Sequence, residues 1–252
     1  MDVARSGPID LNGRVAIVAG GARGIGQATC VALAREGAQV VICDVLPTSD
    51  TAALVKQKGK SALEFRCDIS KKEDVVHVVK ETVRASGRID ILVNCAAILE
   101  RNSSAPVEEV SEEEWNRVFR VNVWGTFNLC QAVWPIMKEQ KYGKIICFGS
   151  VAGKAGAIKS GIAYSSSKGA VHALIKTMAK KGAQLGIYVN GVAPAFVQTP
   201  QTRDMGLSAD AVPIGRLGDP EDQAEAVVFL ASQASNFITG LVLDVNGGMY
   251  LG

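Results

Sequence analysis

Residues 15–26 read VAIVAGGARGIG. Five apolar residues, typical of a buried strand, lead directly into a glycine-rich loop, and a helix-forming stretch follows as far as Glu36. Glycine lets a backbone turn sharply and approach a pyrophosphate, whose charge is then stabilised by the free N–H groups and the dipole of the helix. A glycine-rich loop alone is also consistent with a simple tight turn. The order strand, loop, helix favours nucleotide binding.

Apolar runs typical of buried strands recur from this stretch to the end of the chain, separated by longer segments of helical periodicity. Seven strands buried on both faces are predicted, at residues 15–19, 40–43, 63–65, 89–93, 144–148, 187–192 and 241–245. Strands joined by single helices pair in parallel through right-handed crossovers. The expected fold is an α/β doubly wound parallel sheet with helices on both faces, a single domain over 11–252 after an N-terminal tail at 1–10. Ligands in such a sheet bind at the carboxyl ends of the strands.

Helix beginnings are predicted from three capping patterns: Ser70 with Glu73, Ser111 with Glu114, and Asp219 followed by Pro220. Between the last two predicted strands, residues 196–219 have no regular pattern and contain several Gly, Pro and Asp residues. A long irregular loop beside a pocket is often functional. We therefore expect this segment to act as a lid over the substrate.

The composition favours a protein that acts on small molecules in solution, in a reducing compartment. The chain is 48% hydrophobic and 21% charged, with a formal net charge of +2, so neither nucleic-acid binding nor an acidic tail is indicated. Its six cysteines form no Cys-x-x-Cys pair and its two histidines complete no metal site. No apolar run has the length of a membrane span or the form of a signal peptide. A cytoplasmic protein with no metal and no membrane partner is expected.

Two acidic residues follow the second and third predicted strands. Asp44 lies eighteen residues after Gly26, where a carboxylate can accept hydrogen bonds from a ribose diol, although any Asp in a loop can be a turn residue or helix cap. Asp68 is either a contact of an adenine edge or a neighbour of a helix N-cap. A carboxylate at Asp44 would repel the 2′-phosphate of NADP, so the expected cofactor is NAD, with Arg23 as the opposing cation.

A second group of polar residues indicates acid–base chemistry. Tyr164 and Lys168 are four apart on a predicted helix, so both side chains project from one face, and the ammonium is expected to lower the pKa of the phenol. Ser150 follows the fifth strand, where a hydroxyl could bind the reacting oxygen. Asn122 lies in an apolar helical stretch, where it is either a satisfied core residue or part of a proton path.

Together these residues resemble the short-chain dehydrogenase/reductase family over nearly the whole chain. The resemblance is carried, in sequence order, by the glycine loop from Gly20 to Gly26, Asp68, Asn94, Asn122, Ser150, Tyr164, Lys168 and residues 194–199. It implies a Rossmann-type fold and an oxidoreductase that transfers a hydride between nicotinamide and a secondary alcohol or ketone. The cofactor contacts that it implies are Gly20, Arg23, Gly24, Ile25, Gly26, Asp44, Asp68, Ile69, Asn94, Ala96, Tyr164, Lys168, Pro194, Val197 and Thr199.

The family resemblance also implies a role for each catalytic residue. Tyr164 would exchange the proton as general acid or base, and Ser150 would orient the substrate oxygen. Lys168 would hold the nicotinamide ribose and tune the tyrosine, while Asn122 would anchor a water between the lysine and solvent. Residues 194–199 would bind the nicotinamide carboxamide. Pairing through the helical segments 111–140 and 163–181 would give a homotetramer or a homodimer.

Three departures from the family pattern, all of them small side chains, concern only the fine hydrogen bonding of the fourth strand and the fit around the nicotinamide. Ala19 replaces a usual Thr, Cys95-Ala96-Ala97 replaces Asn-Ala-Gly, and Ala195 replaces Gly. One alternative is a 3-oxoacyl carrier-protein reductase, a type that usually carries basic residues at the pocket mouth and a longer lid. Another is a non-catalytic nucleotide-binding protein, against which the complete set of polar residues argues.

The substrate itself is not defined by the sequence. A largely apolar pocket is expected from Ile98, Leu99, Ala152, Ile158 and Phe196, with Lys154 and Lys159 as polar contacts. The two histidines, His77 and His172, are expected at the surface or at an interface, and the three tryptophans are expected to serve packing.

Overall fold

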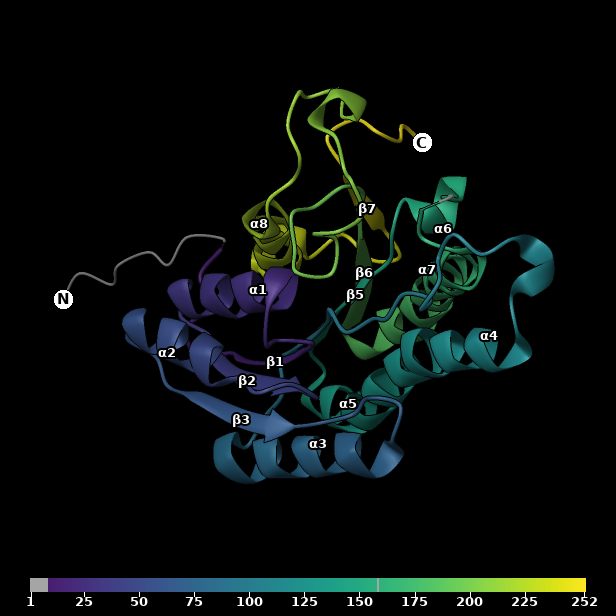
Figure 1. Cartoon of the computed structure of the whole chain (residues 1–252). Coiled ribbons are helices and arrows are strands. Elements are labelled where there is room, and N and C mark those ends of the chain that lie inside the picture. The colour runs from purple at the N-terminus through teal and green to yellow at the C-terminus, as the bar shows by residue number, and fades with distance from the viewer. Residues whose placement is uncertain (1–8, 158) are drawn as a thin grey trace.

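The protein is built around one parallel sheet, as a computed structural model describes for residues 9–157 and 159–252. The strands are β1 (Val15–Ala19), β2 (Gln39–Asp44), β3 (Ala62–Arg66), β4 (Ile91–Asn94), β5 (Gly143–Phe148), β6 (Ile187–Pro194) and β7 (Val242–Val245). They are ordered β3-β2-β1-β4-β5-β6-β7, and every neighbouring pair is parallel (Figure 1). This confirms the predicted seven-stranded, doubly wound, single Rossmann-like domain.

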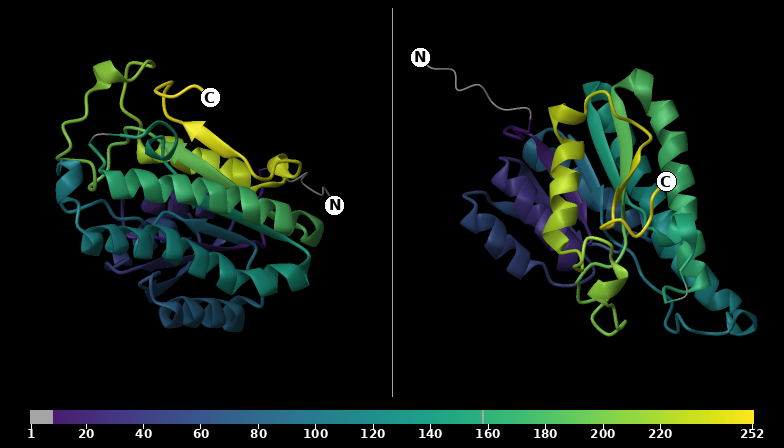
Figure 2. Two further views of the ribbon diagram at one scale, coloured as in Figure 1. Left: turned by 90° about the vertical axis from the view of Figure 1, so that its right-hand side faces the viewer. Right: turned by 90° about the horizontal axis from the view of Figure 1, so that it is seen from above.

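Helices cover both faces of the sheet (Figure 2). The principal ones are α1 (Gly24–Arg35), α2 (Ser49–Gln57), α3 (Lys72–Ser86), α4 (Glu112–Phe119), α5 (Thr126–Gln140), α7 (Ile162–Gly182) and α8 (Pro220–Ala231), with a short α6 (Ala152–Ala155). Alternate residues of β1 divide between two cores: Ile17 packs with residues of α3, α5 and α7, whereas Ala16 and Val18 pack with residues of α1 and α8. The central strands therefore read as continuous apolar runs.

The two edge strands differ from the prediction of strands buried on both faces. β3 has no fully buried residue, and in β7 only Val242 is buried. Each edge strand has a neighbour on one side only, so part of its surface stays open to solvent. The fourth strand also begins two residues later than predicted, at Ile91, and extends through Asn94.

Two of the three predicted helix caps agree with the structure. Ser111 caps α4 by accepting the N–H of Glu114, and α8 begins with Pro220 after Asp219, whose N–H donates to the Asp222 carboxylate. The cap predicted at Ser70 is wrong. Helix α3 starts after Lys71, and the N–H and hydroxyl of Ser70 donate to the carboxylate of Asp68 instead.

The two ends of the predicted lid, residues 196–219, are hydrogen-bonded to each other. The amide of Gln198 donates to Gly218 O and that of Gly218 to Phe196 O, both at 2.8 Å. Between these ends the chain forms a long loop that projects beyond the sheet (Figure 1). The loop contains one short 3-10 turn, Ala209–Ala211. In the described ranges, no helix combines the length and the apolar character needed to cross a bilayer.

Candidate active site

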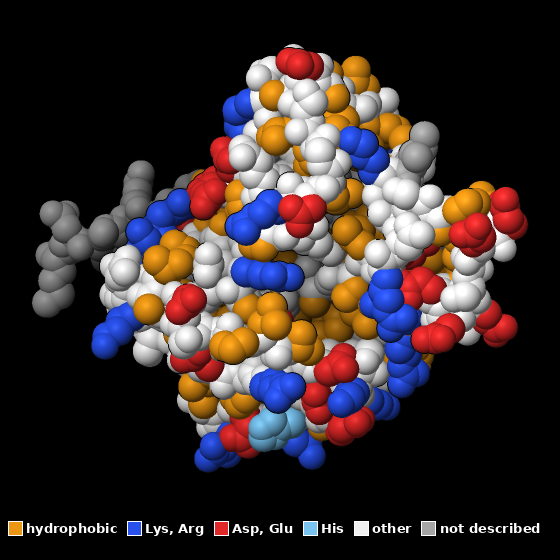
Figure 3. Space-filling model, in the orientation of Figure 1, with side chains coloured by type: hydrophobic (Ala, Val, Ile, Leu, Met, Phe, Trp, Pro, Cys, Tyr) orange, Lys and Arg blue, Asp and Glu red, His pale blue; other side chains and the backbone are white. Residues whose placement is uncertain are grey.

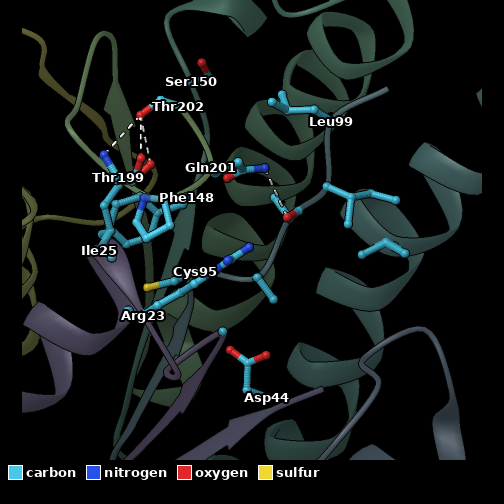
Figure 4. A pocket seen from close by; sticks show the side chains of 18 of the residues that line it. Arg23, Ile25, Asp44, Cys95, Leu99, Phe148, Ser150, Thr199, Gln201 and Thr202 are labelled. Atoms are coloured by element: carbon cyan, nitrogen blue, oxygen red, sulfur yellow. Dashed lines mark hydrogen bonds between the residues drawn. The ribbon is translucent and has the colours of Figure 1, made fainter. Parts of the chain in front are cut away.

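A pocket of about 730 Å³ lies at the carboxyl ends of the strands, as expected for a doubly wound sheet. On the face seen in Figure 3, hydrophobic side chains gather around a central hollow, with Lys and Arg side chains beside it. The loops after β1, β2, β4, β5 and β6 all contribute residues to its wall, and several of these are drawn in Figure 4. Every predicted cofactor contact except Asn94 lines this pocket.

The glycine loop is shaped for close backbone approach. Gly20 has φ of +78°, and a Cβ there would lie 2.6 Å from the amide nitrogen of Ala96. A Cβ on Gly26 would lie 1.9 Å from the carbonyl oxygen of Gly20. Helix α1 begins at Gly24 with no side-chain cap hydrogen bond from Arg23 and no acidic residue in its first turn. This uncapped helix end, on the pocket wall, suits a phosphate group.

Asp44 stands at the pocket wall where the ribose was expected. In this structure its two oxygens accept the N–H groups of Ala22 and Leu46, each at 3.0 Å. The carboxylate therefore fixes the turn of the glycine loop as well as facing the pocket. Arg23 also lines the pocket, and Figure 4 shows its side chain extending inward from the loop.

Asp68 and Asn94 hold the backbone around the nucleotide end. Asp68 lines the pocket, with one oxygen bound to Ser70. Asn94 is buried and does not line the pocket, and its contact with the cofactor stays a prediction. Its amide donates to Thr126 Oγ1 at 2.8 Å, and its oxygen accepts the N–H of Ala96, so its side chain is turned into the core.

Ser150, Tyr164 and Lys168 lie together on one wall of the pocket. The Lys168 ammonium is 5.6 Å from the centre of the Tyr164 ring and donates to the carbonyl oxygen of Phe148 at 2.7 Å. Burial raises the pKa of Tyr164 to about 12, against the opposing effect of a hydrogen bond with Ser150. The expectation of a lowered phenol pKa is therefore wrong, because burial outweighs the opposing hydrogen bond with Ser150. Burial also lowers the pKa of Lys168 to about 8.

Asn122 lies in a π-helical turn, Arg120–Gly125, between α4 and α5. Its side chain is buried and does not line the pocket. The oxygen accepts the N–H of Ile98 at 2.9 Å, while the amide donates to Ile98 O at 2.9 Å and to Ser167 Oγ at 3.0 Å. These hydrogen bonds satisfy the buried side chain, as the first of the two alternatives from sequence requires, and a part in a proton path stays a prediction. π-Turns often mark functional positions in helices.

His172 is buried beneath Ser150, contrary to the prediction of a surface or interface position. Its Nε2 accepts the backbone N–H of Ser150 at 3.3 Å, and a Cβ on Gly149 would lie 2.1 Å from that nitrogen. Burial lowers the pKa of His172 to about 4, assisted by nearby lysines, so the imidazole is neutral. In the sequence, this close packing of the imidazole is indicated by nothing more than the glycine at position 149. His77, in contrast, is exposed as expected.

The predicted substrate contacts divide into two groups. Ile98 and Leu99 line the pocket, whereas Ala152 and Phe196 do not, and Ile158 falls outside the described residues. The two lysines are engaged elsewhere: Lys154 pairs with Asp244 at 2.6 Å, and Lys159 donates to the carbonyl oxygens of Met205 and Gly206 in the predicted lid. Lining residues that sequence reasoning missed include Arg101, Arg117, Val121, Gln201 and Thr202.

Comparison with known proteins agrees with this geometry. Residues 20–250 match a family model described as "Enoyl-(Acyl carrier protein) reductase". The chain is 35% identical to the 3-oxoacyl-[acyl-carrier-protein] reductase FabG of Thermotoga maritima, over 96% of this chain and 99% of that protein. It is 36% identical to the L-fucose dehydrogenase of Oryctolagus cuniculus, over 95% and 86%. The crystal structure of gox2181 superposes with a TM-score of 0.89 at 35% identity, covering 96% and 97%.

Fold and site thus define an oxidoreductase with a nucleotide-binding doubly wound sheet. The chain belongs to the short-chain dehydrogenase/reductase family.

Proposed function

We propose that this protein transfers a hydride between NAD and the carbon of a secondary alcohol or ketone, with Tyr164 as general acid or base. The observation that carries the proposal is the convergence of Ser150, Tyr164 and Lys168 on the same pocket as the glycine loop. A phenol and a hydroxyl side by side on an apolar wall can hold one carbonyl oxygen between them. The same chemistry makes the non-catalytic alternative the weaker one.

The pocket fits a dinucleotide by its own features. The uncapped end of α1 would hold the pyrophosphate, and the tight packing at Gly20 and Gly26 keeps that path free of side chains. Pro194, Val197 and Thr199 would hold the nicotinamide end. When bound, the nicotinamide supplies or accepts the hydride, and the chain supplies placement and proton handling.

The proton chemistry follows from the burial of the two titrating groups. With a pKa of about 12, Tyr164 stays protonated near neutral pH and is prepared to donate to a ketone oxygen. For alcohol oxidation the phenol must lose its proton, and Lys168, with a pKa of about 8, is cationic below that pH and favours the phenolate. Ser150 orients the oxygen by a hydrogen bond.

Asp44 supports NAD as the cofactor. Its carboxylate would accept hydrogen bonds from a ribose diol but would face a 2′-phosphate with like charge. Two like unit charges about 4 Å apart, at an effective dielectric of about 20, repel each other by about 4 kcal/mol before salt screening. Arg23 could turn toward a 2′-phosphate, yet Val45 leaves no basic residue just after β2.

The alternative substrate class is an acyl thioester, as in a 3-oxoacyl carrier-protein reductase. Two basic residues, Arg101 and Arg117, line the pocket mouth, and this favours the alternative more than the sequence did. However, Arg117 is bound to Glu114 and to Leu99 O, and Arg101 lies within 4 Å of Glu113 and Glu114. Their charge is largely offset, so a neutral substrate is the first choice.

The test is turnover of purified protein with NADH and with NADPH against aliphatic and aryl ketones, sugar and steroid ketones, and acetoacetyl thioesters. We expect NADH to be consumed with at least one neutral ketone, with kcat/KM about a hundredfold above that for NADPH. Asp44→Ala should narrow this gap. Absence of turnover across the panel would contradict the proposed function, whereas preference for NADPH or for thioesters would contradict only the cofactor or substrate assignment.

Assembly and location are part of the same proposal. An outward face of the α4–α5 segment carries Trp124, which is 42% exposed and whose ring lies 5.7 Å from that of Phe127. Such a face suits pairing into a homodimer or homotetramer. All six cysteines are free thiols, and free thiols are typical of the reducing cytoplasm, which we propose as the location.

A further inference from the structure

We infer that Glu100 is a positioning residue for Tyr164, an inference that rests on the proposed function. The residue is buried, at 7% exposure, and does not line the pocket. One oxygen accepts the N–H of Ala163 and the other accepts the N–H of Tyr164, each at 3.2 Å. Glu100 therefore caps α7 at the residue that carries the phenol.

Helix α7 needs this cap because its own N-cap position provides none. That position is Gly161, with no side chain to accept the first N–H groups. Its φ of +81° favours glycine, and a Cβ there would lie 1.7 Å from Glu100 Oε2. Glycine at 161 thus leaves room for a carboxylate from another element. A negative charge at a helix N-terminus is also favourable to the helix dipole.

The backbone that carries Glu100 is fixed along its length. We call residues 98–101, which are part of the connection between β4 and α4, the strap. Asn122 binds both the N–H and the carbonyl of Ile98. Arg117 donates to Leu99 O at 2.8 Å, and Glu114 accepts the N–H of Arg101 at 2.6 Å. The strap therefore presents Glu100 to α7 from a defined position.

The main-chain carbonyl of Tyr164 is also held through Asn122. Its carbonyl accepts the hydroxyl of Ser167 at 2.7 Å, and that hydroxyl in turn accepts from Asn122 Nδ2 at 3.0 Å. Tyr164 is thus fixed at its N–H through the strap and at its carbonyl through Ser167, and Asn122 is common to both connections. Asn122 and Glu100 act on the reaction by holding the main chain of Tyr164, and neither lines the pocket.

The experiment compares Glu100→Ala, Glu100→Gln and wild type by hydrogen–deuterium exchange, NADH binding and steady-state turnover. Glu139→Gln is the matched control, because Glu139 is exposed on α5 and does not line the pocket. In Glu100→Ala we expect the amides of Ala163 and Tyr164 to exchange at least about tenfold faster, the scale of a lost helix cap, and kcat to fall about tenfold or more. The Kd for NADH should stay within about twofold, because the nucleotide end is untouched.

Glu100→Gln keeps the volume and one acceptor, so its kcat should lie between wild type and Glu100→Ala, and it serves if the alanine variant does not fold. Unchanged exchange at Ala163 and Tyr164, or an unchanged kcat with faster exchange, would overturn the inference. An equal loss of kcat and of NADH affinity would also overturn it, because it would indicate general disruption. Faster exchange in Glu100→Ala with an inactive wild type would support the cap and reject the proposed function instead.

Discussion

At the scale of single residues, the site depends on buried groups that hold the backbone of the pocket-lining residues. His172 under Ser150 and Glu100 under Tyr164 each accept the main-chain N–H of a proposed catalytic residue. Neither residue lines the pocket. The reacting hydroxyls are thus fixed from behind by the core, which is the arrangement that precise positioning requires.

The neutral state of His172 predicts a pH-dependent stability. In the unfolded chain its pKa is near the ordinary 6.5, but in the fold it is about 4, so between these values the unfolded state binds more protons. The free energy of unfolding therefore decreases by up to about 3 kcal/mol as the pH falls from 6.5 to 4. Denaturant unfolding of wild type and His172→Gln across this range measures the difference.

In that comparison His172→Gln retains an acceptor for the Ser150 N–H but does not titrate, so its stability should fall less toward pH 4. His77→Gln is the matched control, because His77 is exposed and its loss should leave the wild-type pH dependence intact. Parallel curves for wild type and His172→Gln would mean that the imidazole is as easily protonated in the fold as in the unfolded chain.

Sequence reasoning identified the residues that touch the pocket better than those that support it. Ser150, Tyr164 and Lys168 carry their chemistry in a pattern of residue types and spacings, and all three line the pocket. Glu100 and His172 act across 63 and 22 positions of the chain, and nothing local marks such pairings. The raised pKa of Tyr164 could not be predicted from the sequence either, because it is set mainly by burial.

At the scale of elements, the helix that carries Asn122 is interrupted by a π-turn between α4 and α5. Apolar periodicity predicted one helical segment here and could not indicate the turn, since the extra residue per turn depends on tertiary contacts. The strands were predictable because their apolar runs are long and buried. Only the edges, β3 and β7, departed from that pattern, since edge strands lack a neighbour on one side.

The exposed face of α4–α5 predicts assembly. Trp124 is 42% exposed on this face, and we expect burial of that face between two copies to give a dimer or tetramer in light scattering at micromolar concentration. Trp124→Glu should reduce the measured mass by placing a charge in the interface. Val107→Glu is the control, since Val107 is 72% exposed but lies in the short 3-10 turn before α4. A wild-type mass near 26.5 kDa, that of one chain, would contradict the expectation.

At the scale of the whole molecule, the order of the strands brings the glycine loop and the proposed catalytic residues to one pocket. β1 pairs with β2 on one side and β4 on the other, so the glycine loop after β1 opens beside the loop after β4, and the Gly20 Cα faces the Ala96 amide across that gap. β5 then provides Ser150 next to β4. Residues more than a hundred positions apart therefore share one pocket because of the sheet topology.

The central claim is that the Tyr164 phenol transfers the proton while the pocket binds the nucleotide, and one comparison of kcat tests it most directly. Tyr164→Phe is measured beside Tyr142→Phe, a partly buried tyrosine outside the pocket whose ring contacts the Arg14 guanidinium. We predict that Tyr164→Phe lowers kcat by about a hundredfold or more, the scale of general acid–base catalysis, with an unchanged Kd for NADH, and that Tyr142→Phe stays near wild type. A Tyr164→Phe protein that retains more than about half of the wild-type kcat would contradict the account.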